Sequence, residues 1–292
     1  MTRVRKLHRH FGAEITAVDL SVPLDDELFR QIQDAFNEHA VLVFPDQSLD
    51  DERQLAFSSR FGPLETSIRK DRKRRVNRPE VSDISNVDEH DRIVRADDER
   101  AIYNAGNQLW HSDSSFKRVP AMASLLSARE VPPEGGETEF ADMRAAWDAL
   151  SEEKRRGLEG LVAVHDFVYS RGLIGYDQFT EAERVAVPPV QQALVRTHPV
   201  TGRKSLFLGS HASHIIGWPV EEGRRLLREL LEFATQPRFV YRHSWRVNDL
   251  GMWDNRCVLE RGRAVDPSYL RVIHRATVAG VGPTAIDGKA VE

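Results

Sequence analysis

The pattern of apolar and polar positions predicts a helix close to the N-terminus. Leu28, Ile32 and Phe36 follow one another at intervals of four residues, which places them on one face of a helix over residues 23–39. The apolar run 41–44 comes next and is short enough to indicate a buried strand. An amphipathic helix followed by a buried strand indicates a folded domain with its own core.

A second helix is predicted over residues 50–61, because the Gly-Pro pair that follows it is a strong signal for a turn. Residues 62–107 differ from the rest of the chain, since they are polar and show neither a helical nor a strand period. They hold six cations within 69–75 and an acidic stretch over 88–99. A long segment of this kind inside a compact domain is usually functional, so we expect an active-site lid or binding loop here.

The second half of the chain predicts many short strands with few helices between them. Such a series is typical of an antiparallel sandwich or jelly roll with helical insertions. The glycine-rich phosphate loops and the GxSxG signature of serine hydrolases are absent from the sequence. We therefore expect a mainly β fold with helical insertions, built as a single domain over residues 1–292. The expected strands are 121–129, 138–141, 161–167, 204–208, 239–243, 249–253 and 272–278, and the expected helices are 143–159 and 220–234.

Composition narrows the classes of protein that fit this pattern. Hydrophobic residues make up 40 % and charged residues 29 % of the chain, which excludes intrinsic disorder. A formal net charge of −4 argues against a dedicated nucleic-acid-binding protein, which would usually be basic. The single cysteine, Cys257, excludes an internal disulfide and any zinc site that needs two thiolates. With no secretory signal and no apolar run near the length of about 20 residues that a membrane helix needs, we expect a cytoplasmic protein without membrane partners.

The segment NQLWHSDSSF, residues 107–116, holds a histidine and an aspartate two positions apart. In an extended chain His111 and Asp113 point to the same side, so an imidazole and a carboxylate could chelate one metal ion. Two histidines and one carboxylate form the facial triad of non-haem Fe(II) oxygenases. The HxD pattern alone is common, and a surface histidine beside an aspartate is the plainer interpretation of it.

Other motifs give this segment more weight. They are PPEGGETEF, DMRAAWDAL, RTHPVTGRK, GSHASH and MWDNRCVL. In these motifs, from about residue 10 to 280, the chain resembles the taurine and 2,4-dichlorophenoxyacetate dioxygenase family, and it is closer to the second branch. The resemblance implies a double-stranded β-helix (a jelly roll) that uses Fe(II), with 2-oxoglutarate as cosubstrate and O₂. It also implies hydroxylation of a small anionic substrate, most simply an aryloxyalkanoate-like carboxylate, by a homo-oligomer.

The resemblance further implies roles for particular residues. His111 and Asp113 would be the first two iron ligands. Thr138 would hydrogen-bond a carboxylate of 2-oxoglutarate, and Arg271 would form a salt bridge to the distal carboxylate. Arg275, four positions later on the same side of a strand, would hold an anionic group of the substrate, because a guanidinium matches the geometry of a carboxylate.

Two further positions are expected near the substrate by the same resemblance. Lys70, in the basic run 69–75, lies near the position of a residue that meets the substrate carboxylate, and Asn107 belongs to the substrate-proximal stretch. From the residues alone, the basic run is either a solvated loop offset by the acidic residues 88–99, a contribution to anion binding, or a nucleic-acid patch. It lacks interleaved aromatic residues, so no nucleic-acid partner is expected. Asn107 could equally satisfy backbone groups at a strand edge.

One position departs from the family pattern. After MWDNRCVL the family has a histidine as third iron ligand, whereas this chain has Glu260. Three interpretations are open: Glu260 is itself the third metal ligand; Glu260 turns away and leaves a catalytically impaired protein that binds 2-oxoglutarate or another anion; or the position is altered in an otherwise ordinary oxygenase. With Glu260 as ligand the protein would supply one imidazole and two carboxylates, a set that is less selective for iron over Mn²⁺ or Mg²⁺.

Overall fold

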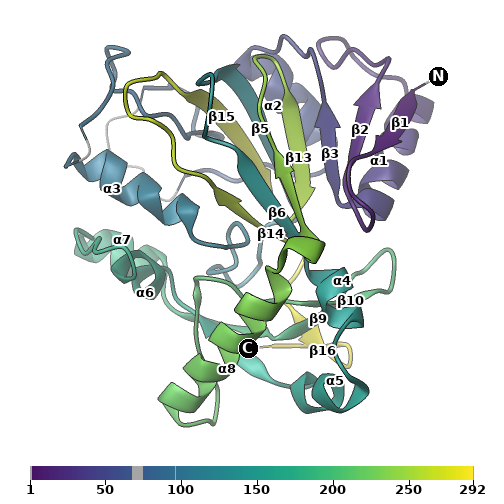
Figure 1. Ribbon diagram of the computed structural model, residues 1–292, viewed down its shortest axis with the longest axis vertical. Coiled ribbons are helices and arrows are strands. Elements are labelled where there is room, and N and C mark those ends of the chain that lie inside the picture. Colours follow the sequence, from purple (N-terminus) through teal and green to yellow (C-terminus); the bar gives the residue numbers. More distant parts are fainter. Residues whose placement is uncertain (1, 68–74, 96, 292) are drawn as a thin grey trace.

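Seven strands form the larger sheet of the protein (Figure 1). The computed structural model describes residues 2–67, 75–95 and 97–291. The strands lie in the order β1-β2-β3-β13-β5-β15-β4, so segments from both ends of the chain meet in the middle of the sheet. Neighbouring strands are antiparallel except for β2 and β3, which are parallel. The strands are β1 (Arg3–Lys6), β2 (Ala13–Thr16), β3 (Val41–Phe44), β4 (Val81–Asp83), β5 (Ala123–Glu130), β13 (Leu250–Asp254) and β15 (Val272–Val278).

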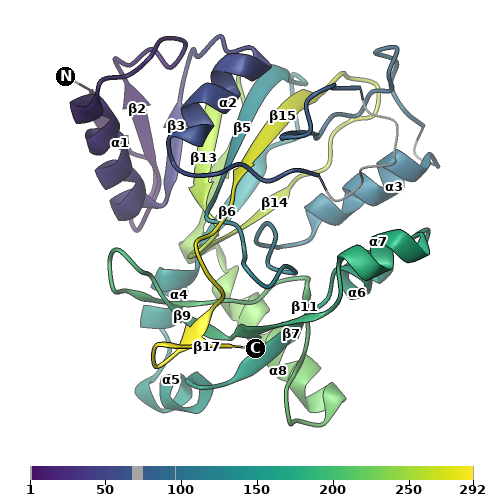
Figure 2. The same cartoon turned by 180° about the vertical axis from the view of Figure 1, so that it is seen from behind.

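Helices α1 (Asp26–His39) and α2 (Asp51–Ser59) cover the outer face of this sheet (Figure 2). Two residues of the predicted stripe are buried: Ile32 and Phe36 of α1 pack against Leu125 and Met252 in one apolar cluster, whereas Leu28 is only partly buried. Each helix begins after an aspartate whose carboxylate accepts a backbone N–H of the first turn, a common way to start a helix. The helices expected over 23–39 and 50–61 are thus confirmed, with slightly later starts.

A three-stranded sheet faces the other side of the larger one. Successive side chains of a strand point to opposite faces, so Met252 faces α1 and α2 while its neighbour Trp253 faces this second sheet. Trp253, fully buried, packs in one cluster with Phe140 and Val258 of the smaller sheet. The central strands are therefore buried on both faces. The smaller sheet has the order β12 (Val240–His243), β6 (Thr138–Asp142), β14 (Val258–Gly262).

The remaining part of the chain forms a second layer below the two sheets (Figure 1). Helix α8 (Val220–Ala234) has the predicted bounds, but the single helix expected over 143–159 is wrong. Its residues form two helices, because Ser151 starts a new one by accepting the N–H of Lys154 at its hydroxyl. This layer contains α4 (Met143–Asp148), α5 (Glu152–Leu158), the sheet β11-β7-β8 (Ala212–Ile215, Val162–His165, Val190–Ala193) and the pair β9 (Val195–Thr197) and β10 (Lys204–Leu206).

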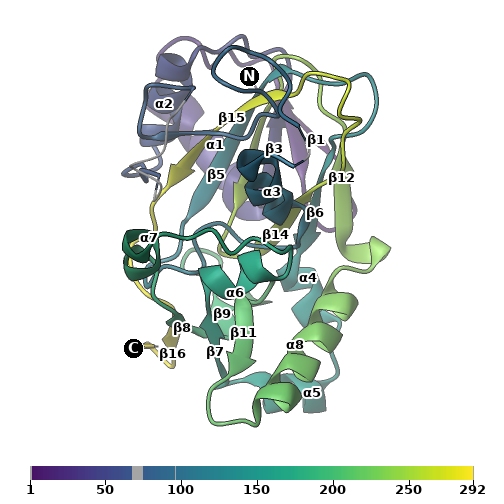
Figure 3. The same cartoon turned by 90° about the vertical axis from the view of Figure 1, so that its left-hand side faces the viewer.

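The polar segment 62–107 is not a plain loop as expected, since it carries strand β4, helix α3 (Glu99–Ala105) and the 3₁₀ turn η1 (Gly106–Gln108). Helix α3 lies above α6 (Phe167–Gly172) and α7 (Glu181–Ala186) in all three views, most clearly in Figure 3. No helix in the described ranges is both long and apolar enough to cross a membrane. The other elements are η2 (Pro237–Phe239), β16 (Ala285–Ile286) and β17 (Lys289–Ala290).

Gln54 fixes helix α2 to the centre of the larger sheet. Its side chain is fully buried, and its amide nitrogen donates to the carbonyls of Leu125 (3.2 Å) and His274 (3.0 Å) on two adjacent strands. Its amide oxygen accepts from Arg129 at 3.1 Å. An apolar side chain at this position would leave the two carbonyls and the Arg129 guanidinium without these hydrogen bonds.

Replacing Gln54 by Met is expected to lower the free energy of unfolding by about 2 kcal/mol, because buried polar groups are left without partners while the volume is nearly kept. Urea unfolding followed by circular dichroism measures this. The control Gln31→Met, on the exposed surface of α1, should change stability by less than about 0.5 kcal/mol. Equal effects of the two substitutions would contradict the role given to Gln54.

Candidate metal and ligand site

Three buried side chains converge where His111 forms an isolated antiparallel bridge with Glu260. The two residues exchange backbone hydrogen bonds of 2.9 and 2.8 Å, which sets their side chains next to each other. His111 Nε2 lies 3.4 Å from Glu260 Oε1 and 3.9 Å from Asp113 Oδ1. One ligand atom from each of the three residues lies within 4.8 Å of the others. The structure thus brings together all three residues that the sequence singled out for a metal.

Asp113 reaches this cluster from a turn and not from the extended strand that the HxD pattern suggested. The next residue, Ser114, has a positive φ of 55°, so the chain turns away directly after Asp113. Ser124 holds the Asp113 carboxylate, because the Ser124 hydroxyl donates to Oδ2 at 2.6 Å. The backbone N–H of Asp113 donates to Asn255 Oδ1 at 3.1 Å. The Asn255 amide in turn donates to Ser124 Oγ at 2.9 Å. These contacts leave Oδ1 directed at His111.

The protonation states follow from burial and from the hydrogen bonds. His111 Nδ1 lies 2.7 Å from the carbonyl of Leu109, so Nδ1 carries the proton and Nε2 presents its lone pair to the carboxylates. Burial lowers the pKa of His111, which keeps the ring neutral. Burial, and then the charge of Asp113, raise the pKa of Glu260 to about 8, although Arg275 and Arg271 act against this.

A second buried group of residues has side chains of metal-binding types, but its contacts differ from those of the first. In the described part of the chain, His198, Asp254 and Cys257 also lie close together. Arg256 donates to both oxygens of Asp254 (2.8 and 2.7 Å), and His198 Nε2 lies 2.9 Å from Oδ2. Burial opposes ionisation of Asp254, but these donors hold its pKa far below the usual range. A cation would have to displace Arg256, so we interpret this group as a structural network.

A cavity of about 360 Å³ opens on one side of the His111 cluster and is lined by Thr138, Glu260 and Arg271. Arg271 donates to the carbonyls of Ile84 (3.1 Å) and Gly136 (3.4 Å), and no carboxylate of the described residues lies within salt-bridge distance of it. Burial lowers the pKa of its guanidinium to about 10. Thr138 Oγ1 accepts from the indole N–H of Trp245 at 3.0 Å, which leaves its own proton for another acceptor. A partly buried guanidinium without an ion-pair partner suits an anion.

A second cavity, of about 210 Å³, lies on the other side of the cluster between α3 and α6. It is lined by His111, Asp113 and aromatic side chains such as Tyr103 and Phe167. Arg275 lines both cavities and donates to Asp113 Oδ1 at 2.6 Å, with Glu260 Oε1 at 3.9 Å. Burial opposes its charge, yet the two carboxylates raise its pKa. Arg275 therefore neutralises part of the charge of the cluster.

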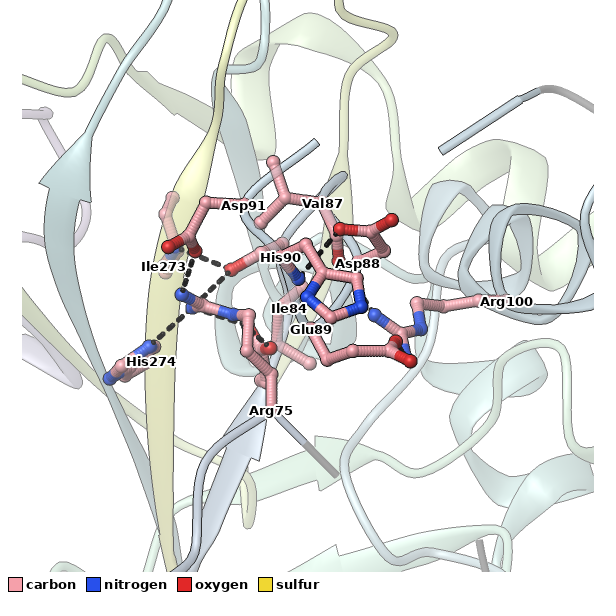
Figure 4. A network of polar contacts seen from close by, with 12 residues as sticks. Arg75, Ile84, Val87, Asp88, Glu89, His90, Asp91, Arg100, Ile273 and His274 are labelled. Carbon is pink, nitrogen blue, oxygen red and sulfur yellow. Dashed lines mark hydrogen bonds and ion pairs between the residues drawn. The ribbon is translucent and has the colours of Figure 1, made fainter. Parts of the chain in front are cut away.

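The polar segment closes over these cavities and is anchored by Arg75 (Figure 4). Arg75 donates to Asp83 (2.8 Å), to Asp91 (3.1 Å) and to Nε2 of His274 (2.9 Å). His274 Nδ1 lies 2.6 Å from Asp51 of α2, which continues the network across β15. The expectation that acidic residues offset the basic run holds for Arg75 and Asp91. This network ties the segment to the strand that carries Arg271 and Arg275.

The other two predicted substrate residues have different outcomes. Asn107, in the turn η1, lines both cavities and not a strand edge. Lys70 lies outside the described residues, so its predicted role is not tested. Ser124 and Asn255, which orient Asp113, were not selected from the sequence as site residues. Asn255 lies within MWDNRCVL and could have been found there, whereas only the pairing of strands reveals Ser124.

The chain is similar along most of its length to known proteins of one family. A family model described as taurine catabolism dioxygenase TauD, TfdA family matches residues 3–277. The chain is 49 % identical over 276 residues to the alpha-ketoglutarate-dependent 2,4-dichlorophenoxyacetate dioxygenase of Burkholderia sp. (strain RASC), covering 94 % of this chain and 93 % of that protein. It is 51 % identical over 273 residues to the protein of the same name from Cupriavidus pinatubonensis, covering 93 % and 95 %. The crystal structure of AAD-2 in complex with Mn(II) and N-oxalylglycine superposes with a TM-score of 0.90 at 47 % identity, covering 98 % of this chain and 99 % of that one.

The stability of the metal-free protein should depend on pH through Glu260. Its pKa in the folded protein, about 8, lies above the ordinary value of 4.5. Its contribution to stability is therefore fully present below pH 4.5 and is lost as the pH rises through about 8. We expect the melting temperature to fall over this range with a chelator present. Glu260→Gln should flatten the fall, and Glu232→Gln, on the exposed surface of α8, should not. Equal slopes for all three proteins would show that the pKa of Glu260 is not raised in the folded protein.

Proposed function

This chain belongs to the taurine catabolism dioxygenase TauD, TfdA family, and we propose that it hydroxylates aryloxyalkanoate carboxylates with Fe(II), 2-oxoglutarate and O₂. The observation that carries the proposal is the cluster of His111, Asp113 and Glu260 between two cavities that are each lined by an arginine. The family places a double-stranded β-helix beneath such a site, and we infer that the two facing sheets form it. The single domain, the homo-oligomer and the cytoplasmic location remain predictions.

The three residues of the cluster fit a divalent cation. His111 offers a lone pair at Nε2, Asp113 is oriented by Ser124, and Glu260 is a carboxylate whose pKa is raised by its surroundings. A cation would relieve the repulsion between the two carboxylates and keep Glu260 ionised. We propose that Glu260 is the third ligand. Fe(II) held here together with 2-oxoglutarate would supply the oxidant for hydroxylation.

The larger cavity is proposed to hold 2-oxoglutarate. Arg271 would pair with the distal carboxylate, because its guanidinium is partly buried and bonded only to carbonyls among the described residues. Thr138 lines the same cavity and has a hydroxyl proton left to donate. The smaller cavity, with Tyr103, Phe116 and Phe167 in its walls, would receive the aryl ring. Asn107 would meet both ligands, since it lines both cavities.

A second candidate function is favoured by one contact. The 2.6 Å ion pair between Arg275 and Asp113 engages one of the presumed metal ligands. If metal binding cannot compete with this pair, the chain would be an anion-binding member of the family without turnover. The two functions differ in whether a metal enters the cluster.

Arg271→Gln is expected to raise the Kd of 2-oxoglutarate for the Mn(II)-loaded protein by about 10- to 100-fold, because a charge-assisted pair is lost. Calorimetric titration measures this. The control Arg242→Gln removes an exposed arginine paired with Glu139 and should leave the Kd unchanged. An unchanged Kd in Arg271→Gln would remove 2-oxoglutarate from the larger cavity.

The function is tested by titrating Fe(II) and 2-oxoglutarate under argon into the protein, Glu260→His and Glu260→Ala, and following the visible charge-transfer band of the chelate. We expect the band with the unchanged protein and with Glu260→His. The metal affinity of Glu260→Ala should be lower by about tenfold or more. Succinate should form after air and phenoxyacetate are added to the unchanged protein. A band in Glu260→His alone would make the unchanged chain the anion-binding member.

A further inference from the structure

Arg171 differs from the other cations of the smaller cavity. Arg75, Arg100, Lys117 and Arg275 line the same cavity, and each has a carboxylate within salt-bridge distance. Arg171 has none among the described residues, although it is only 6 % exposed. Its Nε is buried without a hydrogen-bond partner. A buried charge without an opposite charge is costly, so its retention in a cavity wall points to a ligand.

The surroundings of Arg171 hold its guanidinium in one place. The guanidinium carbon lies 4.9 Å from the ring centre of Tyr103 on α3 and 4.8 Å from that of Phe167 on α6. Tyr103 also makes a polar contact with the guanidinium. Gly106 leaves the space for its tip, because a methyl group there would lie 1.8 Å from Nη1. The backbone of Gly106 has an ordinary φ of −59°, so this glycine is required for space and not for conformation.

The position of Arg171 suits the substrate of the proposed reaction. In phenoxyacetate the carbon next to the ether oxygen, where hydroxylation is proposed, is bonded directly to the carboxylate carbon. The cation that holds this carboxylate must therefore lie beside the metal cluster. Arg171 lines one cavity with His111 and Asp113, and its charge acts on the His111 ring. Arg275 also lies at the cluster, but Asp113 already occupies it at 2.6 Å.

We propose that Arg171 binds the carboxylate of the organic substrate and so selects anionic over neutral aryl ethers. This inference rests on the proposed function and names a residue for its specificity. The other cations of the cavity wall are each paired with a carboxylate. An incoming carboxylate can therefore bind Arg171 without breaking an existing salt bridge. The stacked rings keep the guanidinium from turning away, which lowers the entropy lost on binding.

The test uses protein loaded with Mn(II) and N-oxalylglycine, so that it does not depend on turnover. Calorimetry measures the Kd of phenoxyacetate and of its neutral amide for the unchanged protein, Arg171→Gln and Arg196→Gln. Arg196 is a matched control, since it is partly buried with Nη1 lacking a hydrogen-bond partner, stacks on Phe207 at 4.4 Å and has no carboxylate partner among the described residues. We expect Arg171→Gln to raise the Kd of phenoxyacetate about 10- to 100-fold and to leave that of the amide nearly unchanged. Arg196→Gln should change neither.

A second variant protects the test against loss of folding. Gly106→Ala keeps the arginine but places a methyl group against Nη1, so it should displace the flexible tip and weaken phenoxyacetate binding selectively. Parallel losses for phenoxyacetate and the amide, or no loss in either variant, would overturn the role of Arg171 alone. If the unchanged protein binds N-oxalylglycine but not phenoxyacetate, the proposed substrate class is wrong and the inference is overturned with it.

Discussion

Two carboxylates buried within one cluster are the constraint on which the site depends. Asp113 and Glu260 lie so close to the same imidazole nitrogen that both can be charged only if positive charge is near. Without a metal, Arg275 supplies part of that charge and Glu260 keeps its proton until the pH approaches about 8. A divalent cation bound by the cluster would supply more positive charge than Arg275 does. The cluster is therefore unfavourable without a cation, which is the electrostatic condition for a metal site.

The fold delivers this arrangement from segments far apart in the sequence. The bridge between His111 and Glu260 extends the smaller sheet, while Asp113 is held by Ser124 on the larger one. Arg275 comes from β15, the strand next to the one that carries Ser124. The cluster thus sits where the two sheets meet, and the packing of Trp253 and Phe140 between the sheets fixes their spacing. Rigidity at the site follows from the core beneath it.

The sequence predicted the parts of this structure that are encoded locally. The helix over 220–234 was found with its bounds because its apolar positions have the helical period, whereas 143–159 was wrongly joined because Ser151 can stand within a helix or begin one. The three candidate ligands were found from motifs and their resemblance to a family, not from periodicity. Ser124 and Arg171 carry no local signal, since only the pairing of β5 and the approach of α6 to α3 give them a role.

Three arginines lie around the cluster, and they differ in the partners that they have. Arg275 is paired with Asp113 at 2.6 Å, a contact that does not involve Glu260. Arg275 also lies 3.9 Å from Glu260, so it is engaged by the cluster on both sides. Arg271 belongs to the other cavity. The cation left for an anionic substrate is therefore the one that the cluster does not engage, Arg171 in the wall of the smaller cavity.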